Sequence, residues 1–373
     1  MNLRKSHLAA AVGAALMVGG TMVYAQAPAT PTVQVYGQVS RALMFADDGT
    51  QSKWFHVDNE ASGTRFGFTG NAQAMPGLRA GFRIELDLQS NESQRVSFTP
   101  AGPVSNFPGS TSDVGFSERH MDTWLEGGWG RVNLGQGDGA ANGATESDLS
   151  GTGMANGIGV ADLGGGFQYR TSTSGFSGLT VGQSINQQDF ESRYDRIMYV
   201  TPSFSGFRAQ ASWGQKANTD AKEFSAWYGG KLGGLGELAA AIGYSTRGNA
   251  TGGTKDEYMG GSVSWLHGSG INLTASYSNR DNPAAAGATV RDSTFTYVKV
   301  GYKFGQHAIA VDYGMGDDFI AVGDEATMYG IGYVWNPIRW LELYAAYKIH
   351  SADRTAGSLE DVTIGTIGTR VRF

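Results

Sequence analysis

The sequence predicts an all-β protein, a transmembrane antiparallel β-barrel of up-and-down topology, and three observations carry this prediction. Apolar and polar residues alternate along many segments, and a period of two is the period of a β-strand. Most of these segments have at least nine residues, the length that a tilted strand needs to cross the hydrocarbon layer of a membrane. Tight glycine-rich turns and longer polar loops follow one another in turn, which is typical of a meander.

The amino-acid composition excludes several other classes. The 373 residues include 56 glycines and no cysteine, so neither disulfides nor thiolate metal sites can form. The net charge of −6 gives no support to nucleic-acid binding, which favours a clustered basic surface. After residue 25, no run of 18 apolar residues occurs, so we expect no helix that spans a membrane. The strand pattern must therefore separate a soluble protein from a membrane protein.

Residues 1–25 have the pattern of a secretory signal peptide. A basic head at Arg4 and Lys5 precedes the apolar run 8–20, and small residues around Ala25 form a cleavage site. A transmembrane anchor is the alternative, but the apolar run is too short to cross a bilayer comfortably. We therefore expect cleavage after Ala25, which leaves residues 26–373 as one barrel domain.

Residues 77–88, GLRAGFRIELDL, illustrate the repeating unit. Phe82 and Ile84 fall on one face of the predicted strand, whereas Arg83 and Glu85 fall on the other. The same kind of alternation predicts eighteen strands, at 32–46, 62–70, 77–89, 116–127, 129–136, 165–172, 178–187, 193–204, 206–216, 222–232, 236–247, 256–267, 270–280, 293–304, 306–315, 325–335, 338–350 and 359–373.

A soluble β-sandwich also shows alternation and is the alternative fold. Its strands average five or six residues and follow Greek-key connections, whereas the segments here are longer. Strands that cross a membrane must close into a barrel, because an open edge leaves backbone groups unsatisfied in hydrocarbon. Trp129 and Trp340 lie near strand ends, as in the aromatic girdles of outer-membrane barrels. We predict a barrel whose last strand ends at Phe373, with Arg370 and Arg372 turned inward.

Five segments in order resemble the general porins of Gram-negative bacteria, and together they extend over nearly all of the mature chain. VQVYGQVSRAL (33–43) resembles the first strand of that family, and residues 62–86 resemble the second and third. RHMDTWLEGGWGRVNLGQG (119–137) resembles the fourth and fifth strands, which lead into a loop that folds inside the barrel. YVTPSFSGFRAQASWG (199–214) resembles a hairpin of the family, and the final RVRF resembles its terminal signature.

The count of eighteen strands departs from the sixteen that are usual in that family. The surplus corresponds to 165–172 and 178–187. Residues 169–183 echo residues 199–210, with an aromatic residue, a Ser/Thr-rich turn and the tripeptide FSG in both. The surplus is either a duplicated hairpin, which gives eighteen strands, or partly loop, which gives sixteen. We prefer eighteen.

The charge pattern, rather than a catalytic set, is the candidate functional feature. The resemblance implies that the loop 137–164 folds into the lumen and faces an arginine cluster across a constriction, which would produce a transverse field. The alternative is that these charges are only solvated by water in the lumen. The predicted charges of the pore are Arg65, Arg79, Arg83, Arg131, Arg170 and Arg208 on the wall and Asp138, Glu146, Asp148 and Asp162 on the loop.

No catalytic, cofactor or metal site emerges from the sequence. GTGMANG (151–157) does not join a strand to a helix, so it is a poor phosphate loop. The histidines show no ligand spacing, and no G-x-S-x-G motif occurs. Acidic residues at 47–50 and 316–319 could bind calcium, but such loop tips are common. We expect neither an enzyme nor a cofactor.

The sequence therefore favours a diffusion porin in the outer membrane, which passes small hydrophilic solutes and ions. The resemblance implies a homotrimer surrounded by outer-membrane lipid, and the basic excess on the predicted wall suggests a mild preference for anions. A substrate-specific channel of eighteen strands with a saturable solute site is the first alternative. An outer-membrane enzyme or a purely structural barrel is the second.

Overall fold

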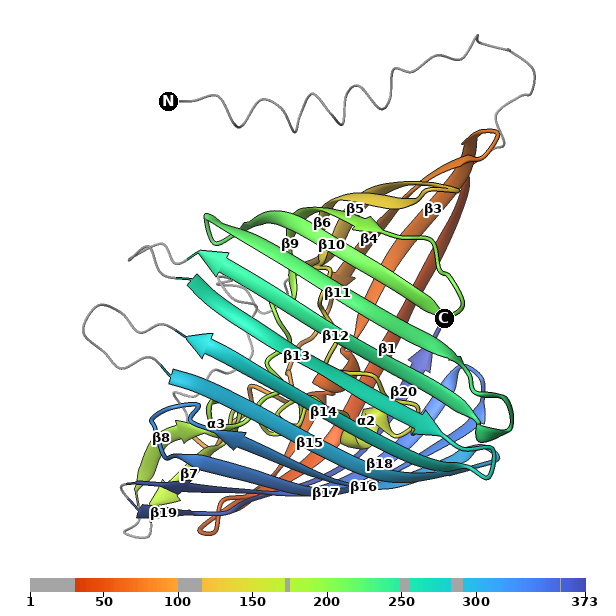
Figure 1. Ribbon diagram of the computed structural model, residues 1–373. Helices are drawn as coiled ribbons and strands as arrows, with labels where there is room; N and C mark the ends of the chain where they lie inside the picture. Colours follow the sequence, from red (N-terminus) through yellow and green to blue (C-terminus); the bar gives the residue numbers. More distant parts are fainter. Residues whose placement is uncertain (1–30, 100–115, 172–174, 249–254, 283–290, 356) are drawn as a thin grey trace, which may run out of the picture.

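The computed structural model describes residues 31–99, 116–171, 175–248, 255–282, 291–355 and 357–373. The predicted signal peptide, 1–25, lies outside the described residues. The described part consists mainly of long, slanted antiparallel strands that form the wall of a barrel (Figure 1). No helix in this part is long and apolar enough to cross a membrane.

Sixteen strands form the wall of the barrel, and each pairs with the next. They are β1 (Thr32–Asp47), β3 (Arg65–Met75), β4 (Leu78–Asp87), β5 (Ser117–Gly127), β6 (Gly130–Asp138), β9 (Arg193–Val200), β10 (Phe207–Lys216), β11 (Thr219–Lys231), β12 (Glu237–Gly248), β13 (Lys255–Leu266), β14 (Ile271–Asn282), β15 (Arg291–Phe304), β16 (His307–Asp317), β17 (Glu325–Ile338), β18 (Leu341–Arg354) and β20 (Val362–Arg372). Because β20 pairs with both β18 and β1, the sheet is closed.

Four further strands lie outside this ring. β2 (Ser52–Asp58) pairs with the second half of β1, and the helical turn η1 (Glu60–Ser62) connects it to β3. β7 (Gln168–Thr171), β8 (Phe176–Thr180) and β19 (Gly357–Glu360) form a small second sheet.

The prediction of eighteen barrel strands is therefore wrong, because 165–172 and 178–187 do not join the wall. β7 has four residues and β8 has five, too few to cross a hydrocarbon layer. The four-residue helix α3 (Val181–Ser184) ends this hairpin, and the Thr180 side chain caps it. Alternation alone could not distinguish a short hairpin within a loop from a spanning strand.

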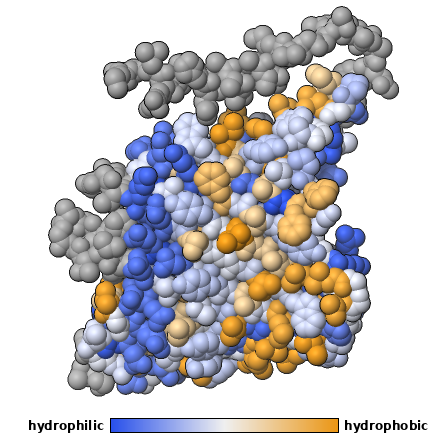
Figure 2. Space-filling model, in the orientation of Figure 1, coloured by the Kyte–Doolittle hydropathy of each residue, from blue (hydrophilic) through white to orange (hydrophobic). Residues whose placement is uncertain are grey.

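The outer and inner faces of the barrel wall differ in polarity, as β14 illustrates. Ile271 and Leu273 point outward and are 45% and 46% exposed, whereas Asn272 and Thr274 point inward and are buried. Figure 2 shows apolar side chains over the outside of the strands and a hydrophilic band at the end with the long loops. Apolar side chains can thus face lipid, while the strands satisfy the backbone polar groups.

The connection between β6 and β9, residues 139–192, is hydrogen-bonded to side chains of the barrel wall. Inward-facing serines accept hydrogen bonds from its backbone: Ser147 N donates to Ser262 Oγ at 2.8 Å, and Leu149 N donates to Ser264 Oγ at 2.9 Å. The short helix α2 (Gly153–Asn156) of this connection packs on β17 and β18. Irregular backbone finds polar partners here that hydrocarbon could not supply.

A buried ion pair fastens the same connection to β15. Lys299 Nζ lies 2.7 Å from Asp148 Oδ2, and the Lys299 side chain is fully buried. Although burial alone would raise the pKa of Asp148, the Lys299 ammonium lowers it below its ordinary value. Since the folded pKa is depressed, the stabilisation is complete above the unfolded pKa and is lost as the pH falls through the folded one.

Phe373, the last residue of the chain, bonds to β1 where the first and last strands of the sheet meet. Gly37 N donates to the Phe373 carbonyl at 3.0 Å, and Phe373 N donates to the Gly37 carbonyl at 3.0 Å. The Phe373 ring covers Gly37, because a Cβ atom there would lie 2.6 Å from Phe373 Cζ and 2.7 Å from the Arg65 carbonyl oxygen. Only glycine leaves room for this contact.

We expect Gly37→Ala to lower the free energy of unfolding by about 1–3 kcal/mol, because the added methyl group must displace backbone at the join. Urea titration of the detergent-folded protein, followed by tryptophan fluorescence, measures this change. Gly365→Ala is the matched control on β20, where the nearest atom to a new Cβ is Phe45 Cβ at 3.8 Å. Equal stability of the two variants would contradict a sealing role for Phe373.

Replacement of Lys299 should release the connection from the wall. We expect Lys299→Met to destabilise the barrel by about 3–5 kcal/mol, because it leaves Asp148 as an uncompensated buried charge. Limited proteolysis of the folded protein should then cut within residues 139–164. The double variant Lys299→Met/Asp148→Asn should regain much of the stability, and a double variant as unstable as the single one would disprove the pairing role.

Candidate functional site

Five arginines and four acidic residues form a cluster on the inner face of β3 to β6 and β9. This group, called the wall cluster below, consists of Arg65, Arg83, Arg119, Arg193, Arg196, Glu85, Asp87, Asp122 and Asp138. A second group, the loop acids, belongs to the connection between β6 and β9. It consists of Glu146, Asp148, Asp162 and Asp189.

Glu85 is the centre of the wall cluster. Arg119 Nε donates to its Oε1 at 2.9 Å, and Arg83 Nη2 donates to its Oε2 at 2.7 Å. Arg65 Nε lies 3.8 Å from Oε1, so three guanidinium groups surround one buried carboxylate. Tyr36 OH also donates to Oε2, at 2.9 Å. Such convergent, charge-assisted bonds hold the side chains in one arrangement.

Arg119 enters the wall cluster through an irregularity in β5. The register with β4 shifts there, since Glu85 pairs with His120 whereas Leu86 pairs with Glu118. Arg119 is the extra residue, and it turns inward to reach Asp87 as well, with Nη1 to Oδ2 at 3.0 Å. A β-bulge of this kind re-aims one side chain. Simple alternation cannot detect it, so sequence analysis missed Arg119.

Two further arginines complete the wall cluster on β9. Arg193 Nε lies 3.1 Å from Asp138 Oδ1, and Arg196 Nη2 lies 2.8 Å from Asp122 Oδ2. Sequence analysis also missed both arginines. For Arg196 the signal was present, because Ile197 faces outward and the alternation therefore places Arg196 inward.

Three of the four loop acids line a hollow in the structure. A cavity of about 320 Å³ separates this part of the connection from η1, and Glu146, Asp148 and Asp162 line it. Arg370 and Glu342, from the wall, line it as well. The cavity lies between a charged wall and a segment rich in carboxylates.

Three loop acids have raised pKa values, unlike Asp148. Burial raises the pKa of Asp162, and the neighbouring charges of Glu60 and Glu146 raise it further. The pKa of Glu146 is raised as well, because protein atoms surround its solvent-exposed side chain, against a hydrogen bond from Gln187 Nε2 at 3.1 Å. Burial and the Glu146 charge raise the pKa of Asp189. These carboxyl groups therefore bind protons at a higher pH than isolated ones.

The structure brings together only some of the charges named from the sequence. Arg65, Arg83 and Asp138 belong to the wall cluster, and Glu146, Asp148 and Asp162 belong to the loop acids. Arg79, Arg131 and Arg208 lie near the end of the barrel with the short turns, away from the wall cluster.

Arg170 is not on the barrel wall at all. It lies in β7, where its Nε is 2.8 Å from Asp48 Oδ2 and its guanidinium covers the Phe176 ring. It therefore links the second sheet to the loop after β1. Its assignment to a barrel strand was wrong, because the segment 165–172 does not join the wall.

Within the part of the chain that the structure describes, no group of three His, Asp or Glu side chains is placed to hold a metal ion.

Comparison with known proteins addresses the family and the fold separately. A family model of Gram-negative porins matches residues 9–355. No curated protein matches the sequence significantly. The fold is similar to that of an anion-selective porin from Comamonas acidovorans, with a TM-score of 0.65 and 20% identity over 92% of this chain and 100% of that chain.

Two other solved structures have a similar fold. The outer membrane protein OmpT of Vibrio cholerae, in its trimer form, has a TM-score of 0.61 and 16% identity, over 92% of this chain and 100% of that chain. The outer membrane channel DcaP of Acinetobacter baumannii has a TM-score of 0.60 and 13% identity, over 92% of this chain and 97% of that chain.

The family match extends over most of the chain, and the closed sheet with apolar outer and polar inner faces agrees with it. The resemblance inferred from sequence motifs is thereby confirmed, as are the outer-membrane localisation and the expectation of a channel rather than an enzyme. The chain belongs to the family of Gram-negative porins.

Proposed function

We propose that this chain forms a water-filled pore for passive diffusion of small hydrophilic solutes and ions, with a mild preference for anions. The observation that carries the proposal is the pair of charged groups, wall cluster and loop acids, on the polar inner side of an apolar-coated barrel. Charged groups in a narrow passage are only partly screened and bias which ions enter. Transport needs no moving part and no cofactor.

The connection between β6 and β9 is the proposed constriction. Its hydrogen bonds to inward serines and the ion pair between Asp148 and Lys299 support a fixed position inside the barrel. The loop acids would then form one side of the passage, and the wall cluster would form the other. Their opposite charges would create a transverse field across the opening.

The proposed anion preference rests on which charges are compensated. Each carboxylate of the wall cluster has an arginine within 4.0 Å. The cluster contains five arginines and four acidic residues, so arginine is in excess. The raised pKa values of Glu146, Asp162 and Asp189 reduce the opposing negative charge at mildly acidic pH. The porin from Comamonas acidovorans is described as anion-selective, which is in line with this proposal.

We further propose a homotrimer within outer-membrane lipid, exported through a signal peptide at residues 1–25. The trimer form of OmpT, a protein of similar fold, supports the oligomeric state. The short turns would face the periplasm and the long loops the cell exterior, as in the porins that the sequence resembles.

A diffusion pore has a simple electrical signature. We expect the purified protein to insert into planar bilayers with stable open steps, and the conductance should rise in proportion to the KCl concentration. Neutral sugars should leave this conductance unsaturated. Current that millimolar sugar blocks to a plateau would instead favour a substrate-specific channel, and a folded barrel without current would refute the pore.

The ion preference should depend on pH because of the loop acids. As the pH falls from 8 to 5, carboxyl groups with raised pKa values become protonated first and lose their negative charge. The permeability ratio of chloride to potassium, taken from reversal potentials in a KCl gradient, should rise by about threefold.

The triple variant Glu146→Gln/Asp162→Asn/Asp189→Asn is the control for this pH dependence. It should show the higher chloride preference already at pH 8 and little further change on acidification. A wild-type ratio that is constant over this range, or one that moves toward potassium, would rule out the loop acids as the titrating groups.

A further inference from the structure

A basic ring lines the inner face of the barrel at the end with the short turns. Alternation along each strand places its members inward, and they lie within a few residues of the turns. The ring, called the short-turn mouth below, has seven basic and three acidic side chains. They are Arg79, Arg131, Arg208, Lys231, Lys303, Arg370 and Arg372, with Glu126, Glu237 and Glu342.

Two of the three acidic residues are already engaged. Glu126 lies 2.7 Å from Arg131 Nη2, and Glu342 pairs with both Arg370 and Arg372. These contacts compensate only part of the charge on β4, β6 and β20, because Arg370 and Arg372 share one carboxylate. The remaining positive charge lies both there and on β10 to β15, where Arg208, Lys231 and Lys303 face only Glu237.

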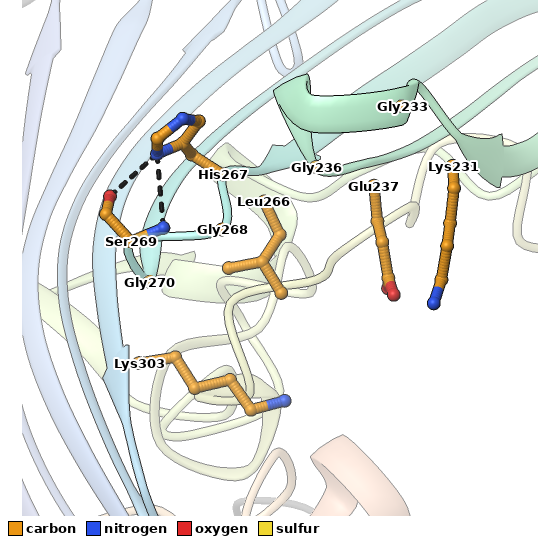
Figure 3. Close-up of a pocket in the computed structure, with 10 residues that line it drawn as sticks. All are labelled: Lys231, Gly233, Gly236, Glu237, Leu266, His267, Gly268, Ser269, Gly270 and Lys303. Carbon is orange, nitrogen blue, oxygen red and sulfur yellow. Dashed lines mark hydrogen bonds between the residues drawn. The ribbon is translucent and has the colours of Figure 1, made fainter.

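Lys231 and Lys303 carry much of that charge. They line a common pocket of about 390 Å³, together with Glu237 and the turn that contains His267. Figure 3 shows the two lysine side chains extending into the open space, whereas the His267 ring is turned toward Ser269. Both lysines are exposed, and neither has an ion-pair partner within 4.0 Å among the described residues. Glu237 is the cross-strand neighbour of Lys231 but lies beyond that distance.

The pocket is close to the proposed constriction. A Cβ atom built on Gly151, in the connection between β6 and β9, would lie 3.7 Å from both Cδ and Cε of Lys303. An anion held at Lys303 would therefore sit next to the connection and partly obstruct the passage. Chloride would gain little from two ammonium groups on opposite sides of such a pocket, whereas an extended oxyanion can contact both.

We propose that the pocket between Lys231 and Lys303 binds multivalent oxyanions of the phosphate and polyphosphate class, which enter from the short-turn end. The binding itself does not require the proposed pore function, but its effect on current does. Glu237 weakens the site, because its carboxylate repels the anion. Because the pocket lies at the short-turn end, we expect the effect to be directional.

Tripolyphosphate added to one side of a planar bilayer tests the site. We expect reduced conductance only when it is added at the short-turn end under a voltage that drives anions inward. The double variant Lys231→Gln/Lys303→Gln should need about tenfold more tripolyphosphate for half-block, and Glu237→Gln should need about threefold less. Orthophosphate should act in the same direction but at higher concentration.

Two controls make the experiment decisive. Gly128→Cys marks the short-turn end for a thiol reagent, since the chain has no cysteine and a Cβ atom at Gly128 has no neighbour within 4 Å. Lys222→Gln is the matched charge control, because Lys222 lies on β11 like Lys231 but faces outward. It should leave the block unchanged.

Equal block from both sides, or block that survives in the double lysine variant, would overturn the proposal while leaving the pore intact. If the wild-type protein carries no current, the pore function fails instead. Equilibrium dialysis of tripolyphosphate against the detergent-folded protein then decides the site alone, since retention by wild type and not by the double variant would support it and equal retention would refute it.

Discussion

The closure of the sheet is the constraint on which the rest of the structure depends. Hydrocarbon offers no hydrogen-bond partner, so each strand that crosses it must be paired along both edges. Over its residues 38–47, β1 meets this requirement with three partners, because β20 covers one edge while β3 and β2 share the other. The Phe373 backbone extends the pairing to the last residue of the chain. An unpaired strand added to this ring would expose polar backbone to lipid.

Closure also determines what the inside of the barrel must contain. Since outward side chains are apolar, the inward ones carry most of the polar groups. The connection between β6 and β9 forms hydrogen bonds and an ion pair with some of them. Its backbone cannot satisfy itself as a strand or a long helix would. Serines at Ser262 and Ser264 accept two of its N–H groups, and Lys299 compensates Asp148. The polar side chains of the wall thus supply partners that an irregular segment needs.

Features that repeat along the chain could be predicted from the sequence, and features that depend on one residue could not. Alternation identified all sixteen wall strands and the inward orientation of Arg65 and Arg83. It failed at 165–172, where a sequence with β-propensity forms a short hairpin within a loop. It also failed at Arg119, where a single bulge turns the side chain to the inner face of the barrel. Alternation also does not show which charged side chains form ion pairs. Three arginines contact Glu85 because β3, β4 and β5 are neighbours in space.

Pairing, more than the number of charges, separates the roles of the inner surface. The wall cluster is dense and nearly balanced in charge, and mutual hydrogen bonds hold its side chains in one arrangement. In the proposed passage, the loop acids would modulate its field as their protonation changes with pH. At the short-turn mouth, in contrast, Lys231 and Lys303 extend without ion-pair partners into an open pocket. Long ammonium groups without ion-pair partners can adapt their position to an anion, whereas the guanidinium groups of the wall cluster are already bound to carboxylates, so the two groups of side chains can be altered independently.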